Sequence, residues 1–177
     1  MPTSSLGSAT HLVTRFFGSI KPGPPPSADE QWAITRLGDG ERALWRQMNN
    51  PDRRHGIIVA HRVVEQLGGA AIRPIIAAAL LHDVGKIASG FRTPARVLAT
   101  LFWAVVPHRR ASDWVDGPRP LRRLAQYRLH PELGEQMLAD AGADPITSSW
   151  AADHHAPEAS WRVDASLGHV LKDCDDD

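Results

Sequence analysis

The spacing of apolar residues is the feature that most restricts how this chain can fold. From His55 to Leu67 they recur every three or four positions until Gly68 and Gly69 end the run, which is the pattern of an amphipathic helix. No segment alternates apolar and polar residues with the two-residue period of a β-strand. Similar runs predict helices at 32–37, 43–48, 75–83, 95–106, 121–129, 131–138, 146–154 and 166–174. We therefore expect an all-α fold.

Turn-forming residues mark the segments between these helices. Ser27, with Glu30 three residues later, matches a capping box that would open the folded region. Glycines are expected to end the first helix at 38–40, and Asn49–Asp52 is a predicted turn. The longest predicted loop is Arg109–Pro120.

The length of the chain fits one domain with an extension. Its 177 residues leave little room for two catalytic units. Residues 1–28 begin rich in serine and threonine and end in Lys-Pro-Gly-Pro-Pro-Pro-Ser, a run that must be extended. We expect a flexible N-terminal extension with a Pro-rich linker over residues 1–28 and a single domain over residues 29–177.

Charge and cysteine content narrow the class of protein. Twenty basic and twenty acidic residues give no net charge, so no global field attracts nucleic acid or anionic lipid. The single cysteine, Cys174, fits a reducing compartment. The apolar run Ala95–Val106 is shorter than the roughly 20 residues of a bilayer span, and no secretory signal is evident. We expect a cytoplasmic protein with no membrane partner.

One local basic cluster stands out against this neutral background. We interpret it as a solvated helix face, and nucleic-acid binding as the less favoured alternative. The cluster consists of Arg109, Arg110, Arg119, Arg122, Arg123 and Arg128.

The chain has nine histidines, and one of them stands beside a carboxylate at the end of an apolar helix. His82-Asp83 follows the seven apolar residues Ile75–Leu81. Burying that carboxylate is costly unless its charge is compensated, as a divalent metal would do. Neighbours on a helix point about 100° apart, so both side chains can reach one ion only near a helix end, which Gly85 supplies. The alternative is an exposed His-Asp pair.

An ordered series of histidine motifs resembles the HD-domain superfamily of metal-dependent phosphohydrolases, whose members are all-helical. His82-Asp83 lies in a segment close to the central motif of that superfamily, and His55 resembles its first histidine. The later histidines resemble the HD-GYP-like branch, whose members carry two or more metals. The segments are Arg54–Ala60, Leu80–Lys86, His130–Gly134, Asp153–His155 and a late Asp173.

The resemblance implies a single HD-domain helical bundle with one or two metal ions. The first ion would be held by His55, His82, Asp83 and Asp173, and the second by Asp83, His130, His154 and His155. Of the last two histidines, one can be a ligand while the other orients it. Imidazole and carboxylate without thiolate suit Fe, Mn, Co, Ni or Zn.

The acidic C-terminus leaves the last ligand open. Asp173 lies four residues after His169, which could orient it. Asp175, Asp176 and Asp177 crowd the same segment, and the alternative interpretation is an acidic tail. The remaining three histidines, at positions 11, 61 and 108, fall outside the pattern.

The implied activity is hydrolysis of a phosphomonoester or phosphodiester, most plausibly of a nucleotide, by metal-activated water. Asp83 would be catalytic as the shared ligand and Lys86 as the positive partner of a phosphoryl oxygen. Arg92 and Arg96 are further phosphate-binding candidates, or surface charges. The alternative function is a non-catalytic module that binds metal and a nucleotide.

Two departures from the branch restrict the substrate. No Gly-Tyr-Pro element follows His155, and Pro51 stands where a glutamate could help to hold a third metal. These departures disfavour cleavage of cyclic di-GMP and a trinuclear site.

Overall fold

The computed structural model describes residues 23–107 and 109–176. Most of the predicted N-terminal extension therefore lies outside the described residues. The described part contains α-helices, two short 3-10 helices and no strand, which confirms the all-α prediction. The α-helices are α2 (Ser27–Ile34), α3 (Asp39–Trp45), α4 (Asn50–Leu67), α5 (Arg73–Leu81), α6 (Lys86–Ser89), α7 (Thr93–Val105), α8 (Arg110–Asp113), α9 (Arg119–Arg128), α10 (His130–Asp140), α11 (Pro145–Asp153) and α12 (Ala165–Asp176). The 3-10 helices are η1 (Gly68–Ala70) and η2 (Glu158–Ser160).

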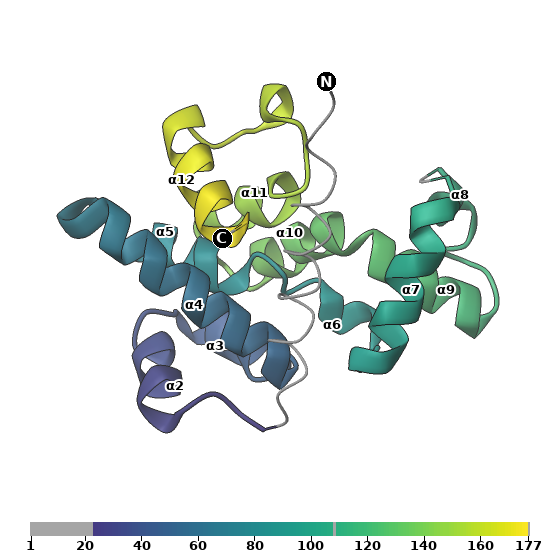
Figure 1. Ribbon diagram of the computed structural model, residues 1–177, viewed down its shortest axis with the longest axis horizontal. Coiled ribbons are helices and arrows are strands. Elements are labelled where there is room, and N and C mark those ends of the chain that lie inside the picture. The colour runs from purple at the N-terminus through teal and green to yellow at the C-terminus, as the bar shows by residue number, and fades with distance from the viewer. Residues whose placement is uncertain (1–22, 108, 177) are drawn as a thin grey trace, which may run out of the picture.

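These helices form a body and an arm (Figure 1). The body consists of α2–α5 and α10–α12, in which α5 packs against α4 and α11, and α12 lies on α4. Its core includes the fully buried Trp45, Leu80, Leu138, Trp150 and Leu171. The arm, residues 86–128, carries α6–α9 and extends to one side of the body.

The close packing of α4 on α5 follows from one glycine. A Cβ on Gly56 would lie 2.5 Å from the carbonyl oxygen of Leu80, so only glycine permits this approach. All seven residues of Ile75–Leu81 are buried, as expected for a helix that is apolar on every side. The end of α5 therefore lies in the middle of the body, and it carries His82-Asp83 there.

The capping box predicted at Ser27 is not formed. Helix α2 does begin at Ser27, but its N-cap is Pro26 and no side chain caps it. Glu30 instead accepts hydrogen bonds from Trp45 Nε1 (2.9 Å) and Arg53 Nη1 (2.6 Å). The indole of a fully buried tryptophan needs a hydrogen-bond acceptor. Because the Glu30 carboxylate accepts this hydrogen bond from Trp45, it does not cap the N-terminus of α2.

Two predicted irregular segments contain helix. The predicted turn Asn49–Asp52 is wrong, because α4 begins at Asn50 and Pro51 suits its first turn. His55 consequently lies in the second turn of α4. The predicted loop Arg109–Pro120 contains the one-turn helix α8, so it is irregular only in part.

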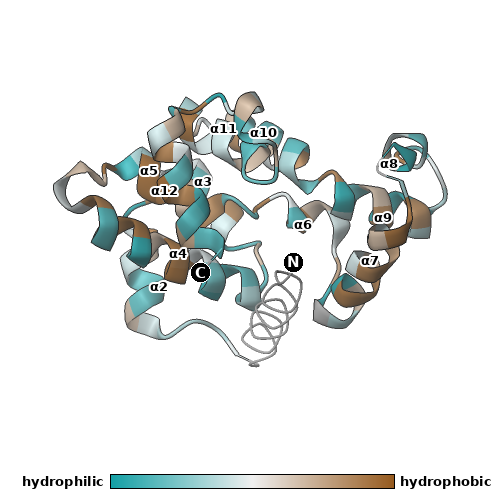
Figure 2. Ribbon diagram, turned by 45° about the horizontal axis from the view of Figure 1, so that its top comes forward, coloured by the Kyte–Doolittle hydropathy of each residue, from teal (hydrophilic) through white to brown (hydrophobic). Residues whose placement is uncertain are grey.

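The arm carries the most apolar exposed surface among the described residues. On α7, Leu98, Leu101 and Val105 are exposed, and Figure 2 shows this helix as strongly hydrophobic. Trp103 on the other side of α7 donates a hydrogen bond from Nε1 to the Leu124 carbonyl (3.0 Å), which ties α7 to α9. No helix in the described part has the length and apolar character needed to cross a membrane.

Candidate metal centre

Helix ends and the inner faces of two helices bring the histidine motifs together inside the body. His82 and Asp83 lie in the turn after α5, and His130 is the first residue of α10. His154 and His155 directly follow α11. Two further side chains complete the centre, His55 from α4 and Asp175 from the last turn of α12.

Four of these residues form a first group around Asp83. Their ligand atoms, those of Asp83, His130, His154 and His155, all lie within 4.8 Å of one another. Asp83 Oδ1 lies 3.5 Å from His130 Nε2 and 3.7 Å from His154 Nε2. The rings of His154 and His155 are adjacent, with centroids 4.0 Å apart. This arrangement matches the spacing of donors around a single ion.

Three of the histidines are oriented by the same type of hydrogen bond to the backbone. Each places Nδ1 against the carbonyl three residues earlier, in the last turn of the preceding helix, where carbonyls lack helical partners. A carbonyl can only accept a hydrogen bond, so Nδ1 carries the proton and Nε2 is left with its lone pair. The contacts are His82 to Ala79 (2.9 Å), His130 to Tyr127 (2.9 Å) and His154 to Ala151 (2.8 Å).

The Nε2 atoms of His130 and His154 are buried and have no hydrogen-bond partner in the described part. They face Asp83 Oδ1 at distances longer than a hydrogen bond. Burial lowers the pKa of His130, and it lowers that of His154 to about 4, so both rings are neutral at pH 7. Two lone pairs then face a carboxylate with no proton between them, and a cation there would satisfy all three groups.

His155 shares this environment from the more exposed side of the group. Desolvation of its ring and the neighbouring His154 and His130 lower its pKa to about 2. It is therefore also neutral at pH 7 and able to donate a lone pair.

The second group consists of His55, His82 and Asp175, whose ligand atoms also lie within 4.8 Å of one another. Asp175 Oδ1 is 2.8 Å from His55 Nε2 and 3.6 Å from His82 Nε2. Burial raises the pKa of Asp175, but His82 and His55 more than offset this, so the pKa lies below its usual range. Asp83 Oδ2 is 3.6 Å from His82 Nε2, which places Asp83 between the two groups.

Lys86 provides a positive charge beside the shared carboxylate. Its Nζ lies 2.5 Å from Asp83 Oδ2. Burial opposes ionisation of both groups, yet Lys86 and His82 hold the pKa of Asp83 well below its usual range. Asp83 and Asp52 raise the pKa of Lys86 despite its burial. Both groups are therefore charged at neutral pH.

The structure places Asp175, rather than Asp173, beside the histidines of α4 and α5. Asp173 is exposed on the outer side of α12. His169 is also exposed, and its Nε2 contacts Glu158 Oε1 at 3.1 Å, so it does not orient Asp173. The buried face of α12 includes Gly168, Leu171 and Asp175. These residues are spaced by three and then four positions, which is the spacing of one helix face. This spacing is the sequence signal that would have favoured Asp175 over Asp173 as the ligand.

Neither predicted phosphate-binding arginine reaches the two groups. Arg92 is exposed at the start of α7. Arg96 forms an ion pair with Asp52 of α4, and both side chains are nearly buried, with 12% and 9% exposure. Its Nε donates to the Phe91 carbonyl (3.0 Å). Arg96 therefore attaches the arm to the body, and no motif in the sequence marks its partner Asp52.

Gly85 allows the turn that carries Asp83 to pack against α10. A Cβ on Gly85 would lie 1.9 Å from the His130 carbonyl oxygen and 2.6 Å from the Gly134 amide nitrogen. Its φ of −63° is ordinary, so the requirement is one of space. The glycine in the central motif thus determines the distance between Asp83 and His130.

Comparisons of the chain with protein-family models, with curated proteins and with solved structures find no match. The chemistry of the centre therefore has to be argued from its own residues. Five imidazoles and two carboxylates, without a thiolate, could hold one or two divalent transition metals.

Proposed function

We propose that this protein is a metal-dependent phosphohydrolase that cleaves a phosphomonoester or phosphodiester. The observation that carries the proposal is the pair of buried, unpartnered Nε2 atoms of His130 and His154 directed at Asp83. Buried polar atoms are normally hydrogen-bonded, and metal ligation explains both why they are buried and why each Nδ1 is held by a carbonyl.

The donor set supports a centre with two ions. Asp83 presents Oδ1 to the histidines of the first group and Oδ2 toward His82 of the second. His55 and Asp175 complete the second group. Iron, manganese, cobalt, nickel and zinc all accept imidazole and carboxylate ligands.

Bound ions of this kind lower the pKa of water and attract phosphoryl oxygens, which is the chemistry that phosphoester hydrolysis requires. The protein supplies the remaining requirements. The lowered pKa of Asp83 keeps its carboxylate charged, and the carbonyl contacts of the histidines keep their lone pairs directed inward. Lys86, an ammonium group beside Asp83, is positioned to bind a phosphoryl oxygen of the substrate.

Membership of the HD-domain superfamily is part of this proposal. The ordered motifs from His55 to Asp83, His130 and His154 support it, with Asp175 as the final aspartate. A nucleotide is the substrate class that this resemblance favours.

Metal content tests the centre directly. We expect purified wild-type protein to hold one or two transition-metal ions per chain and His154→Ala to hold fewer. His169→Ala is the matched control, because His169 is an exposed histidine outside both groups. Elemental analysis after gel filtration gives the count. Equal metal content in wild type and His154→Ala would refute the first group as a metal site.

Turnover tests the activity. Protein loaded separately with each of the five metals is incubated with p-nitrophenyl phosphate, bis-p-nitrophenyl phosphate and a nucleotide panel, and the products are measured. We expect hydrolysis that is lost in Asp83→Asn and reduced in Lys86→Ala. Metal and nucleotide binding without turnover on any substrate would instead establish the non-catalytic module.

A further inference from the structure

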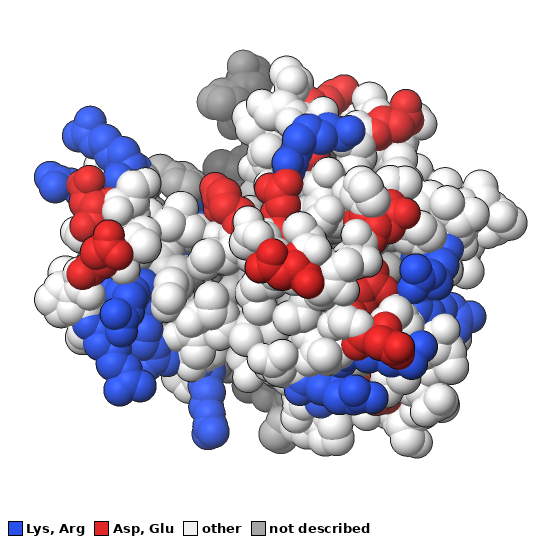
Figure 3. All heavy atoms as spheres, turned by 180° about the vertical axis from the view of Figure 1, so that it is seen from behind, with Lys and Arg blue, Asp and Glu red and all other residues white. Residues whose placement is uncertain are grey.

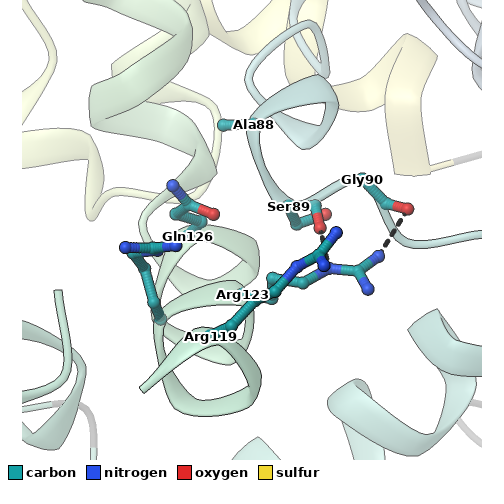
Figure 4. Close-up of a pocket in the computed structure, with 7 residues that line it drawn as sticks. Ala88, Ser89, Gly90, Arg119, Arg123 and Gln126 are labelled. Atoms are coloured by element: carbon teal, nitrogen blue, oxygen red, sulfur yellow. Dashed lines mark hydrogen bonds between the residues drawn. The ribbon is translucent and has the colours of Figure 1, made fainter. Parts of the chain in front are cut away.

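The arm contains a second feature of interest, a cavity of about 600 Å³ between α6 and α9. The end of α6, at Ser89 and Gly90, forms one wall. The other wall consists of Arg119, Arg122, Arg123 and Gln126 of α9. We call this cavity the arginine pocket (Figure 4). It shares no residue with the two metal-binding groups.

Arg123 is the pocket arginine whose side chain is held in place by hydrogen bonds to the protein. Its Nε donates to the Ser89 carbonyl (2.7 Å) and its Nη2 to the Gly90 carbonyl (2.6 Å), as the dashed lines in Figure 4 show. The guanidinium also lies 4.6 Å from the centre of the Phe91 ring. Arg123 thus occupies two carbonyl oxygens that would otherwise repel an anion at the end of α6.

The hydroxyl of Ser89 is hydrogen-bonded to the backbone of Lys86 and Phe91, but the three remaining polar side chains of the pocket are unpaired within the described part of the chain. Arg119, Arg122 and Gln126 have no hydrogen bond or ion pair to any described residue. No aspartate or glutamate lines the pocket. In Figure 4 the Arg119 side chain runs beside that of Arg123 toward Ser89. Guanidinium donors without a carboxylate partner favour an external anion.

The surroundings of the pocket are also positive. The arm carries nine lysines and arginines against two aspartates. Lys86 and Arg96 are paired with Asp83 and Asp52 of the body, which leaves an excess of five positive charges on the arm of a chain whose net charge is zero. Figure 3 shows lysine and arginine side chains gathered over the arm. Arg119 is also the first residue of the ten-residue helix α9, whose N-terminus has no side-chain cap, so the positive end of the helix dipole adds to the field.

We propose that the arginine pocket binds the linked phosphate groups of a small molecule, at a site independent of the metal centre. Three guanidinium groups within the first two turns of one helix, Arg119 and the adjacent Arg122 and Arg123 about one turn later, match an anion with several neighbouring negative charges, as pyrophosphate has. A concave pocket suits a small ligand better than an extended nucleic acid. Arg109 and Arg110, two other arginines of the basic cluster on the arm, do not line it.

The test is calorimetric titration of metal-free protein with pyrophosphate. The double variant Arg119→Ala/Arg122→Ala removes two guanidiniums that are exposed and make no hydrogen bond or ion pair to a described residue. Arg109→Ala/Arg110→Ala is the matched control, since it removes the same charge from the same arm outside the pocket. We expect the first variant to bind at least about tenfold more weakly and the control to differ from wild type by much less.

Equal weakening in the two double variants would overturn the proposal, because binding would then follow the net charge of the arm. Tighter binding of a single-stranded oligonucleotide than of pyrophosphate, with equal losses in both variants, would indicate a nucleic-acid surface instead. In wild-type protein, pyrophosphate should shift the amide resonance of Gly90, and an unchanged Gly90 would contradict the location. His154→Ala, which removes a residue of the first metal-binding group that has no contact with α6 among the hydrogen bonds and ion pairs of the structure, should retain pyrophosphate affinity, which separates this proposal from failure of the metal centre.

Discussion

Replacing Asp175 by asparagine tests the geometry of the second group most sharply. The change removes one negative charge while preserving side-chain size, at an oxygen 2.8 Å from His55 Nε2 and 3.6 Å from His82 Nε2. Loss of a residue that supports a metal ligand weakens metal affinity by about 10–100-fold, and loss of a ligand should cost at least as much. Asp173→Asn is the control, because Asp173 is exposed on the same helix.

The readout is the rise in Tm when metal is added in excess. A tenfold weaker affinity removes about 1.4 kcal/mol of metal-dependent stabilisation. For a chain of this length that corresponds to a metal-induced rise in Tm about 3–6 °C smaller than that of the wild type. We expect this loss in Asp175→Asn and a wild-type rise in Asp173→Asn. Equal rises in both variants, or the loss in Asp173→Asn instead, would refute the assignment of Asp175.

Three further predictions concern stability. The folded-state pKa of His154, about 4, lies below its ordinary 6.5, so the unfolded chain binds more protons between these values. His154 alone should therefore lower the unfolding free energy of metal-free protein by up to about 3 kcal/mol as pH falls from 6.5 to 4, and His154→Gln should reduce the pH dependence by that amount in urea titrations. Gly85→Ala should destabilise the protein by about 1–3 kcal/mol because its Cβ would overlap α10, whereas Gly69→Ala, with open space around its Cβ, should be nearly neutral in Tm. Arg96→Leu should cost about 3–5 kcal/mol by leaving Asp52 buried and unpaired; recovery of chemical-denaturation stability in Arg96→Leu/Asp52→Leu would support this, and an equal or larger loss in the double variant would contradict it.

Most of the helices could be predicted from the sequence, because the periodicity of apolar residues is a local property. The runs 55–67, 75–81 and 95–106 all correspond to helices of the structure. Helix caps and turns were less well predicted. Helix α2 does begin at Ser27, but the capping box is absent because Glu30 accepts hydrogen bonds from Trp45 and Arg53. The expected turn Asn49–Asp52 is the start of α4, where Pro51 suits the first turn.

The grouping of the histidines was expected only from the resemblance of their ordered motifs to a known family. What the sequence shows locally is that His82, His130 and His154 each stand where a helix ends or begins. Glycine and proline mark these positions, and a histidine there can bond the last carbonyls of the preceding helix. The arginine pocket was not accessible in this way. Its walls are about 30 residues apart in the sequence. Nothing in the sequence distinguishes Arg119 from Arg109, and only the packing of α9 against α6 places Arg119 in the pocket.

The sequence by itself thus determined the helical class and the histidine and aspartate motifs, because helix periodicity and end signals act over a few residues. Only the tertiary structure decided between Asp173 and Asp175. That choice depends on the rotation of α12 about its axis. Gly168 helps to set the rotation, since its Cβ would lie 2.4 Å from the Trp161 ring, and burial of Leu171 adds to it. Such packing against distant residues turns one carboxylate inward and leaves its neighbour in solvent.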